Sequence, residues 1–174
     1  QHVIRAASVG RLAMVRFNLA TTPADLEGAH RLFAEILKLS GGADAAIRSE
    51  RAEREAYRSE AYTFKGLIEM RTGRHAQAAS TFQDAFEEFS RSMDGPWFAF
   101  AAGMALEAGG RRGDARRKYG EALNAYDRLK GSMERTGRGE VTGRPWLLSL
   151  VEWMDHAAWV EKSARLAKGE GSDG

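Results

Sequence analysis

Residues 66–89 read GLIEMRTGRHAQAASTFQDAFEEF, and residues 103–126 read GMALEAGGRRGDARRKYGEALNAY. Aligned without a gap, the two stretches carry Gly, Gly, Ala, an aromatic residue and Ala at the same five positions. The matched pairs are Gly66 and Gly103, Gly73 and Gly110, Ala78 and Ala115, Phe82 and Tyr119, and Ala85 and Ala122. The interval from Gly66 to Gly103 is 37 residues, which lies in the range of helical repeat proteins. The two stretches therefore predict two copies of one structural unit.

The shared positions fit a pair of packed helices joined by a tight turn. Gly66 lies where a first helix would let a second helix approach closely, and Gly73 lies where that first helix would end. Ala78, Phe82 and Ala85 follow the i, i+4, i+7 spacing, so they share one face of the second helix. We expect the small residues to admit the facing backbone and the ring to fill the space between hairpins.

Helical periodicity extends through the chain, whereas strand signals are nearly absent. Each of the three prolines lies where a helix would begin, as in the sequence TPAD, where Thr22 is a plausible N-cap with an acid in the first turn. Glycines mark most helix ends. The pattern predicts an all-α chain of about seven helices, near residues 2–20, 23–39, 44–72, 75–92, 96–108, 113–130 and 145–168. The charged first half of 44–72 is read as a solvated helix end, with a docking surface as the alternative.

The repeated positions resemble the tetratricopeptide repeat, whose motif places an aromatic residue, a Leu-Gly pair, Ala, an aromatic residue and Ala over about 34 residues. Tyr62 fits the leading aromatic position. The chain departs from the motif where Lys65 and Ala102 replace the usual Leu, and where Ser90 and Asp127 replace the closing Pro. The resemblance covers residues 59–127.

The resemblance implies a right-handed stack of antiparallel helical hairpins, a tetratricopeptide-like α-solenoid, in a single domain of residues 1–168. The clearest repeats are 59–92 and 96–127. A degenerate copy at 9–40 is suggested because Ala29, Phe33 and Ile36 have the second-helix spacing, although Phe17 stands where the close-approach glycine is expected.

A stack of hairpins cannot leave its last apolar face bare. The predicted helix at 145–168 carries a broad apolar surface that includes Trp146, Leu150 and Trp153. We interpret it as a C-terminal capping helix, and a homodimer or partner interface is the alternative. Residues 169–174 are expected to form a flexible tail.

Composition argues against catalysis. The chain has no Cys, and none of its four His is spaced for metal binding with another His or an acid. No phosphate-binding loop or nucleophile elbow is present. An acid–His contact of His156 with Glu152 or Asp155 is possible, but a structural histidine is the preferred interpretation. We therefore expect no enzyme activity, no cofactor and no bound metal.

The composition and charge of the chain also bear on its compartment and its partners. No apolar run approaches the ~20 residues of a membrane helix, the net charge is only +2, and nucleic-acid binding is not expected. A cytoplasmic, bacterial-type protein is our expectation. The first residue, Gln1, is not Met, so we also expect the chain to be a processed product or a piece of something larger.

The resemblance also implies a site. In this repeat the first helices of successive hairpins line a concave groove that receives peptides. The matching positions here are Phe64, Leu67, Met70, Arg71, Trp97, Phe100 and Met104. They predict a non-catalytic protein–protein interaction scaffold that binds an apolar peptide or an amphipathic helix. A groove filled by the chain's own first or last helix is an equal alternative.

Two other functions stay open. The first is a sensor or effector domain of a transcriptional regulator. The second is phosphate or nucleic-acid contact through the basic segment, which comprises Arg111, Arg112, Arg116, Arg117 and Lys118. Because stacking aromatics are not interleaved with these cations, a solvated basic face is the preferred interpretation.

Overall fold

The computed structural model describes residues 2–41, 48–92, 94–136, 163–165 and 167–168, and these contain helices and no strand. Six helices have defined bounds: α1 (His2–Leu19), α2 (Pro23–Ser40), α3 (Arg48–Arg71), α4 (His75–Phe89), α5 (Gly95–Ala108) and α6 (Arg112–Thr136). The all-α prediction is confirmed. The predicted capping helix at 145–168 lies mostly outside the described residues, as does the predicted tail at 169–174. No helix in the described part of the chain has the length and apolar character needed to cross a bilayer.

Two helix ends differ from their predicted positions. Helix α4 stops at Phe89 because Ser92 N donates to the Phe89 carbonyl at 2.8 Å, which turns the chain before α5. Helix α6 was predicted to end at 130 but continues through Gly131 to Thr136. A glycine inside a helix costs only about 1 kcal/mol, so it does not by itself end one.

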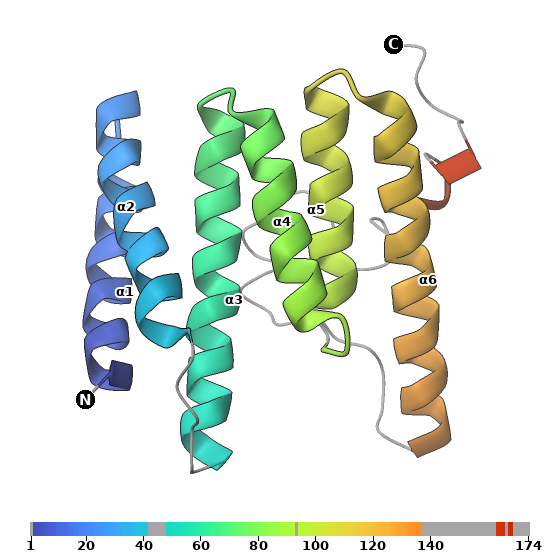
Figure 1. Cartoon of the computed structure of the whole chain (residues 1–174), viewed down its shortest axis with the longest axis horizontal. Helices are drawn as coiled ribbons and strands as arrows, with labels where there is room; N and C mark the ends of the chain where they lie inside the picture. The colour runs from blue at the N-terminus through green and yellow to red at the C-terminus, as the bar shows by residue number, and fades with distance from the viewer. Residues whose placement is uncertain (1, 42–47, 93, 137–162, 166, 169–174) are drawn as a thin grey trace. The chain divides into compact units, whose positions relative to one another are not determined.

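The chain divides into two compact units, Gln1–Thr81 and Phe82–Gly174, with the boundary inside α4. In the first unit α1, α2 and α3 pack side by side, each antiparallel to the one before it (Figure 1). Their core contains a ring cluster in which the Phe64 centroid lies 4.9 Å from that of Phe17 and 5.2 Å from that of Phe33. Ala29, Phe33 and Ile36 are buried, as their shared spacing predicts.

Helix α2 begins with the capping box that its sequence predicts. The Asp25 amide donates to the Thr22 hydroxyl at 3.3 Å, and the Asp25 carboxylate accepts from the Thr22 amide at 3.0 Å. Two backbone donors that the first turn would leave unpaired are thereby satisfied. Hydrogen bonds from the Thr22 side chain and from the amides of Thr21 and Thr22 hold the pKa of Asp25 below its usual range.

The two matched glycines form the same turn. Gly73 and Gly110 have φ of 74° and 79°, a left-handed conformation that glycine adopts without steric cost. Gly73 N donates to Met70 O at 3.1 Å and Arg74 N to Glu69 O at 2.8 Å; 37 residues later, Gly110 N donates to Glu107 O at 2.9 Å and Arg111 N to Leu106 O at 2.8 Å. This pattern is the Schellman motif. The turn is thus repeated in register in the two units.

The second unit contains the close helix approach that its sequence predicts. Helices α5 and α6 pack antiparallel (Figure 1), and a Cβ placed on Gly103 would lie 2.6 Å from Cε1 of the buried Tyr119 ring. The Tyr119 hydroxyl donates to the Glu107 carboxylate at 2.7 Å. Burial, together with that hydrogen bond and the charge of Glu107, raises the pKa of Tyr119.

The second-helix faces point inward in both repeat stretches. The six residues that define them are at most 1% exposed: Ala78, Phe82, Ala85, Ala115, Tyr119 and Ala122. The spacing i, i+4, i+7 therefore marks the buried face of α4 and of α6. How the hairpins stack on one another, and with which hand, stays a prediction.

Candidate functional site

The predicted groove positions of the first unit have different surroundings. Phe64 is a core residue, because its ring is almost fully buried between those of Phe17 and Phe33. Leu67 and Met70 are half-buried, and Arg71 is exposed. The guanidinium carbon of Arg71 lies 4.9 Å from the Phe17 ring centroid, in a cation–π contact.

The second unit gives a similar division. Phe100 is completely buried and its centroid lies 5.4 Å from that of Tyr119. Trp97 and Met104 are half-buried, and the Trp97 centroid lies 6.1 Å from that of Phe100. The indole Nε1 of Trp97 is buried without a hydrogen-bond partner among the described residues.

Phe64 and Phe100, two of the predicted groove residues, are thus buried within their units, and the contact of Phe64 with Phe17 comes from the chain's own first helix. Helix α5 is apolar almost all round, and on such a helix spacing alone does not separate a core residue from a groove residue. Leu67, Met70, Trp97 and Met104 keep some exposed surface. Together with the exposed Arg71, these four residues are the predicted groove residues whose side chains remain accessible in the described structure.

The basic segment is largely paired with acids that lie beside it on α6. Asp114 accepts from Arg111 at 2.6 Å and from Arg117 at 3.0 Å, and Lys118 donates to Glu121 at 2.5 Å. The hydrogen bonds and charges of Arg111 and Arg117 hold the pKa of Asp114 below its usual range. Arg112 and Arg116 are exposed. This pairing reduces the positive potential available to a phosphate.

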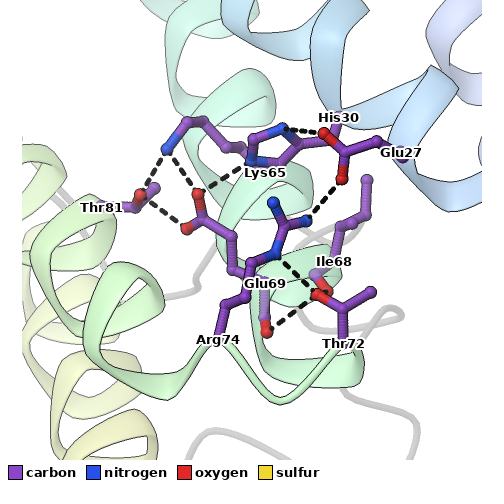
Figure 2. A network of polar contacts seen from close by, with 8 residues as sticks. All are labelled: Glu27, His30, Lys65, Ile68, Glu69, Thr72, Arg74 and Thr81. Carbon is purple, nitrogen blue, oxygen red and sulfur yellow. Dashed lines mark hydrogen bonds and ion pairs between the residues drawn. The ribbon is translucent and has the colours of Figure 1, made fainter. Parts of the chain in front are cut away.

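The most elaborate polar arrangement in the described residues was not predicted. It is centred on Glu69 of α3, whose side chain is only 2% exposed (Figure 2). One carboxylate oxygen accepts from His30 Nε2 at 2.8 Å and from Lys65 Nζ at 2.7 Å. The other accepts from the Thr81 hydroxyl at 2.7 Å, which in turn accepts from Lys65 at 2.6 Å. We call Glu69, His30, Lys65 and Thr81 the Glu69 cluster.

A second layer extends the Glu69 cluster towards the Gly73 turn. Arg74 Nη2 lies 3.0 Å from Glu27 Oε2, an ion pair that lacks hydrogen-bond geometry. Arg74 Nε donates to the Thr72 hydroxyl at 2.9 Å, and that hydroxyl donates to the Ile68 carbonyl at 2.8 Å (Figure 2). Glu27 also lies 3.7 Å from His30 Nδ1. The contacts join α2, α3 and the start of α4 within the first unit.

The electrostatics of Glu69 favour its charged form. Burial raises the pKa of Glu69, but the hydrogen bonds from His30, Lys65 and Thr81 and the charge of Lys65 outweigh that effect and lower it below 4.5. Because an ionised carboxylate can only accept, Nε2 of His30 carries the proton of its hydrogen bond to Glu69. Every polar atom that faces Glu69 is thus engaged, which is the condition under which a buried polar network is stabilising.

The second unit shows that the fold does not need this cluster. At the positions 37 residues later, Leu106 replaces Glu69, Ala102 replaces Lys65 and Lys118 replaces Thr81. The Schellman turn that follows Leu106 has the same hydrogen bonds as the one that follows Glu69. The cluster therefore adds something specific to the first unit, since the turn forms equally well beside an apolar residue.

The side chains of the Glu69 cluster are engaged with one another. The cluster brings His30 and two acids near one another, yet no set of three or more His, Asp or Glu residues in the described ranges is arranged to hold a metal ion. Glu69 is turned inward and its oxygens are already occupied. The predicted alternative of Glu152, Asp155 and His156 lies outside the described residues.

One part of the Glu69 cluster could have been found from the sequence. Lys65 and Glu69 are four residues apart on one helix, a spacing that predicts an ion pair. His30 comes from another helix 39 residues away, and Thr81 lies across the turn. Their convergence on Glu69 depends on tertiary packing, which the spacing of residues along the chain does not show.

No protein-family model, curated protein or solved structure matches the chain. The likeness to the tetratricopeptide repeat therefore depends on the residues quoted above and on the recurrence of the turn and of the buried face.

Proposed function

We propose that the chain is a non-catalytic protein-interaction module built from tetratricopeptide-like helical hairpins, which binds an apolar peptide or an amphipathic helix. The observation that carries the proposal is the recurrence, at 37 residues, of one Schellman turn and one buried Ala–aromatic–Ala face. Recurrent hairpins form rigid scaffolds, and rigid scaffolds bind partners with little ordering cost.

The binding surface in this proposal uses the first helix of each hairpin, taken unit by unit. In the first unit Leu67 and Met70 are half-buried on α3, beside the exposed Arg71. In the second unit Trp97 and Met104 are half-buried on α5. Residues of this kind, with one side fixed in a core and the other accessible, lose little side-chain entropy when a partner covers them.

The Glu69 cluster supports the non-catalytic part of the proposal. A catalytic carboxylate needs a free oxygen facing a substrate, but both oxygens of Glu69 accept hydrogen bonds from protein groups and the side chain is closed to solvent. In the proposal the cluster holds α2 and the start of α4 against α3.

Methyl NMR tests the surface directly. Peptides selected from a random library against the full chain are added to protein labelled at the methionine methyl groups. We expect the Met70 and Met104 signals to shift. A Leu67→Ser, Met104→Ser protein with an unchanged melting temperature should bind the same peptides at least about tenfold more weakly, because apolar area is lost. Equal affinity, or Met70 and Met104 signals that bound peptides leave unchanged, would refute this surface.

A further inference from the structure

Helix α1 exposes an apolar stripe. Leu12, Val15 and Leu19 are 47%, 52% and 72% exposed, and they are the large apolar side chains that the described residues leave open to solvent. Their spacing of three and then four residues places them on one face. Three such side chains on one stripe are unusual for a surface without a partner.

The opposite face of α1 is already used by the fold. Ala6, Ala13 and Phe17 are buried, and Gly10 is buried against Ile36 of α2. Helix α1 is therefore apolar on two opposite faces. A helix with this pattern is normally covered on both sides.

The stripe has the order of a coiled-coil seam. With Leu12 and Leu19 at a positions, Val15 is at d and the exposed Ser8 is at the preceding d. The positions that flank such a seam, g and e, are then occupied by Arg11 and Arg16, both exposed. In coiled coils these two positions select the partner through charge.

The charges on α1 all have the same sign. Residues 2–19 contain Arg5, Arg11 and Arg16 and no acid. In a parallel pair of α1 helices, Arg11 of one copy would face Arg16 of the other, and in an antiparallel pair each Arg would face its own equivalent. Like charges at flanking positions destabilise pairing, so a second copy of this chain is a poor occupant.

We propose that the α1 stripe is a docking surface for a partner amphipathic helix that has apolar a and d residues and Glu or Asp at its flanking positions. Neither Arg11 nor Arg16 forms an ion pair within the described residues. Arg16 Nη1 lies near Gly28 of α2, where a Cβ would be 3.2 Å away, and this flexible side chain can turn to a carboxylate. The surface is on α1, so it does not depend on the α3 and α5 positions proposed above.

The test uses three synthetic helical peptides with identical Leu residues at a and d. The first carries Glu at e and g, the second carries Lys and the third carries Ser. Binding to the chain of residues 1–174 is measured by fluorescence anisotropy. We expect the Glu peptide to bind roughly tenfold more tightly than the Ser peptide and the Lys peptide to bind most weakly.

Two protein variants give the test its specificity. Arg11→Glu combined with Arg16→Glu should reverse the order, so that the Lys peptide binds most tightly. Leu12→Ser combined with Val15→Ser should weaken the Glu peptide by about tenfold or more. Because all four side chains are exposed, each variant should keep the melting temperature of the wild type.

Several results would overturn the proposal. These are equal affinity for the three peptides, no binding of any peptide, or an order that the charge reversal leaves unchanged. Sedimentation equilibrium tests whether a second copy of the chain binds the stripe. Self-association that Val15→Glu abolishes would assign the stripe to a second copy and overturn the proposal. A Leu67→Ser, Met104→Ser protein should bind the Glu peptide normally, which separates this surface from the one proposed for the hairpins.

Discussion

Substitution of Gly103 by Ala tests the close approach of α5 and α6. The new Cβ would lie 2.6 Å from Cε1 and 2.7 Å from Cδ1 of Tyr119. The ring would have to move by about 0.8 Å, from 2.6 to 3.4 Å, to reach an ordinary contact. It is buried and its hydroxyl is held by Glu107 at 2.7 Å, so it has little freedom to move.

The expected magnitude combines two opposing effects. Overpacking a core costs typically 1–3 kcal/mol, and weakening a hydrogen bond to a carboxylate adds roughly 1 kcal/mol. Replacing a helical Gly by Ala returns about 1 kcal/mol. We expect Gly103→Ala to lower the free energy of unfolding by about 2 kcal/mol, measured by urea denaturation followed by circular dichroism.

Gly120 of α6 supplies the matched control, because a Cβ there would meet nothing within 4 Å. Gly120→Ala should stabilise the protein by about 1 kcal/mol through helix propensity alone. A Tyr119→Leu background should remove most of the cost of Gly103→Ala, since the atoms in contact are gone. If Gly103→Ala proves stabilising, or costs the same with and without Tyr119, the close approach does not exist.

Substitutions centred on three further positions, Gly110, Thr22 and Glu69, have predicted outcomes. Gly110→Ala should cost about 1 kcal/mol in thermal unfolding because φ of 79° strains any side chain, and an unchanged melting temperature would argue against the left-handed turn. Thr22→Ala should cost about 1 kcal/mol by loss of the cap, whereas Thr22→Ser should be nearly neutral. Glu69→Ala should cost roughly 3–5 kcal/mol because it strands the Lys65 charge, while Glu69→Leu with Lys65→Ala, the pair found at 106 and 102, should cost much less. The lowered pKa of Glu69 stabilises the folded state at pH values above the unfolded pKa near 4.5, and this contribution is lost as the pH falls through the folded pKa. The free energy of unfolding should therefore fall less steeply on acidification in Glu69→Gln than in the wild type.

Much of the local structure could be predicted from the sequence because it depends on short-range chemistry. The capping box at Thr22, the left-handed glycines at 73 and 110 and the buried face around Tyr119 each follow from a few residues of known spacing. The end of α6 could not be predicted in this way. Gly131 is a typical stop signal, but the helix passes through it at small cost.

The candidate site was harder to predict because it depends on which helices meet. Leu67 and Phe64 lie three residues apart on α3, yet one keeps exposed surface and the other is in a ring cluster with Phe17. The hydrogen bond between Glu69 and His30 could not be predicted either, because the two residues lie on different helices. The exposure of Leu12, Val15 and Leu19 also depends on packing, because helical periodicity does not tell which apolar face of α1 contacts α2.

The Glu69 cluster has a consequence for how a chain with two similar hairpins folds. If α5 were to take the place of α3 during folding, Leu106 would face Thr81, and the Thr81 hydroxyl would lose the carboxylate that accepts its proton. A buried hydroxyl without an acceptor costs about 1–3 kcal/mol, so the exchanged arrangement would be disfavoured from its first contacts. The pair of Glu69 and Thr81 should therefore favour the pairing of α3 with α4 over that of α5 with α4.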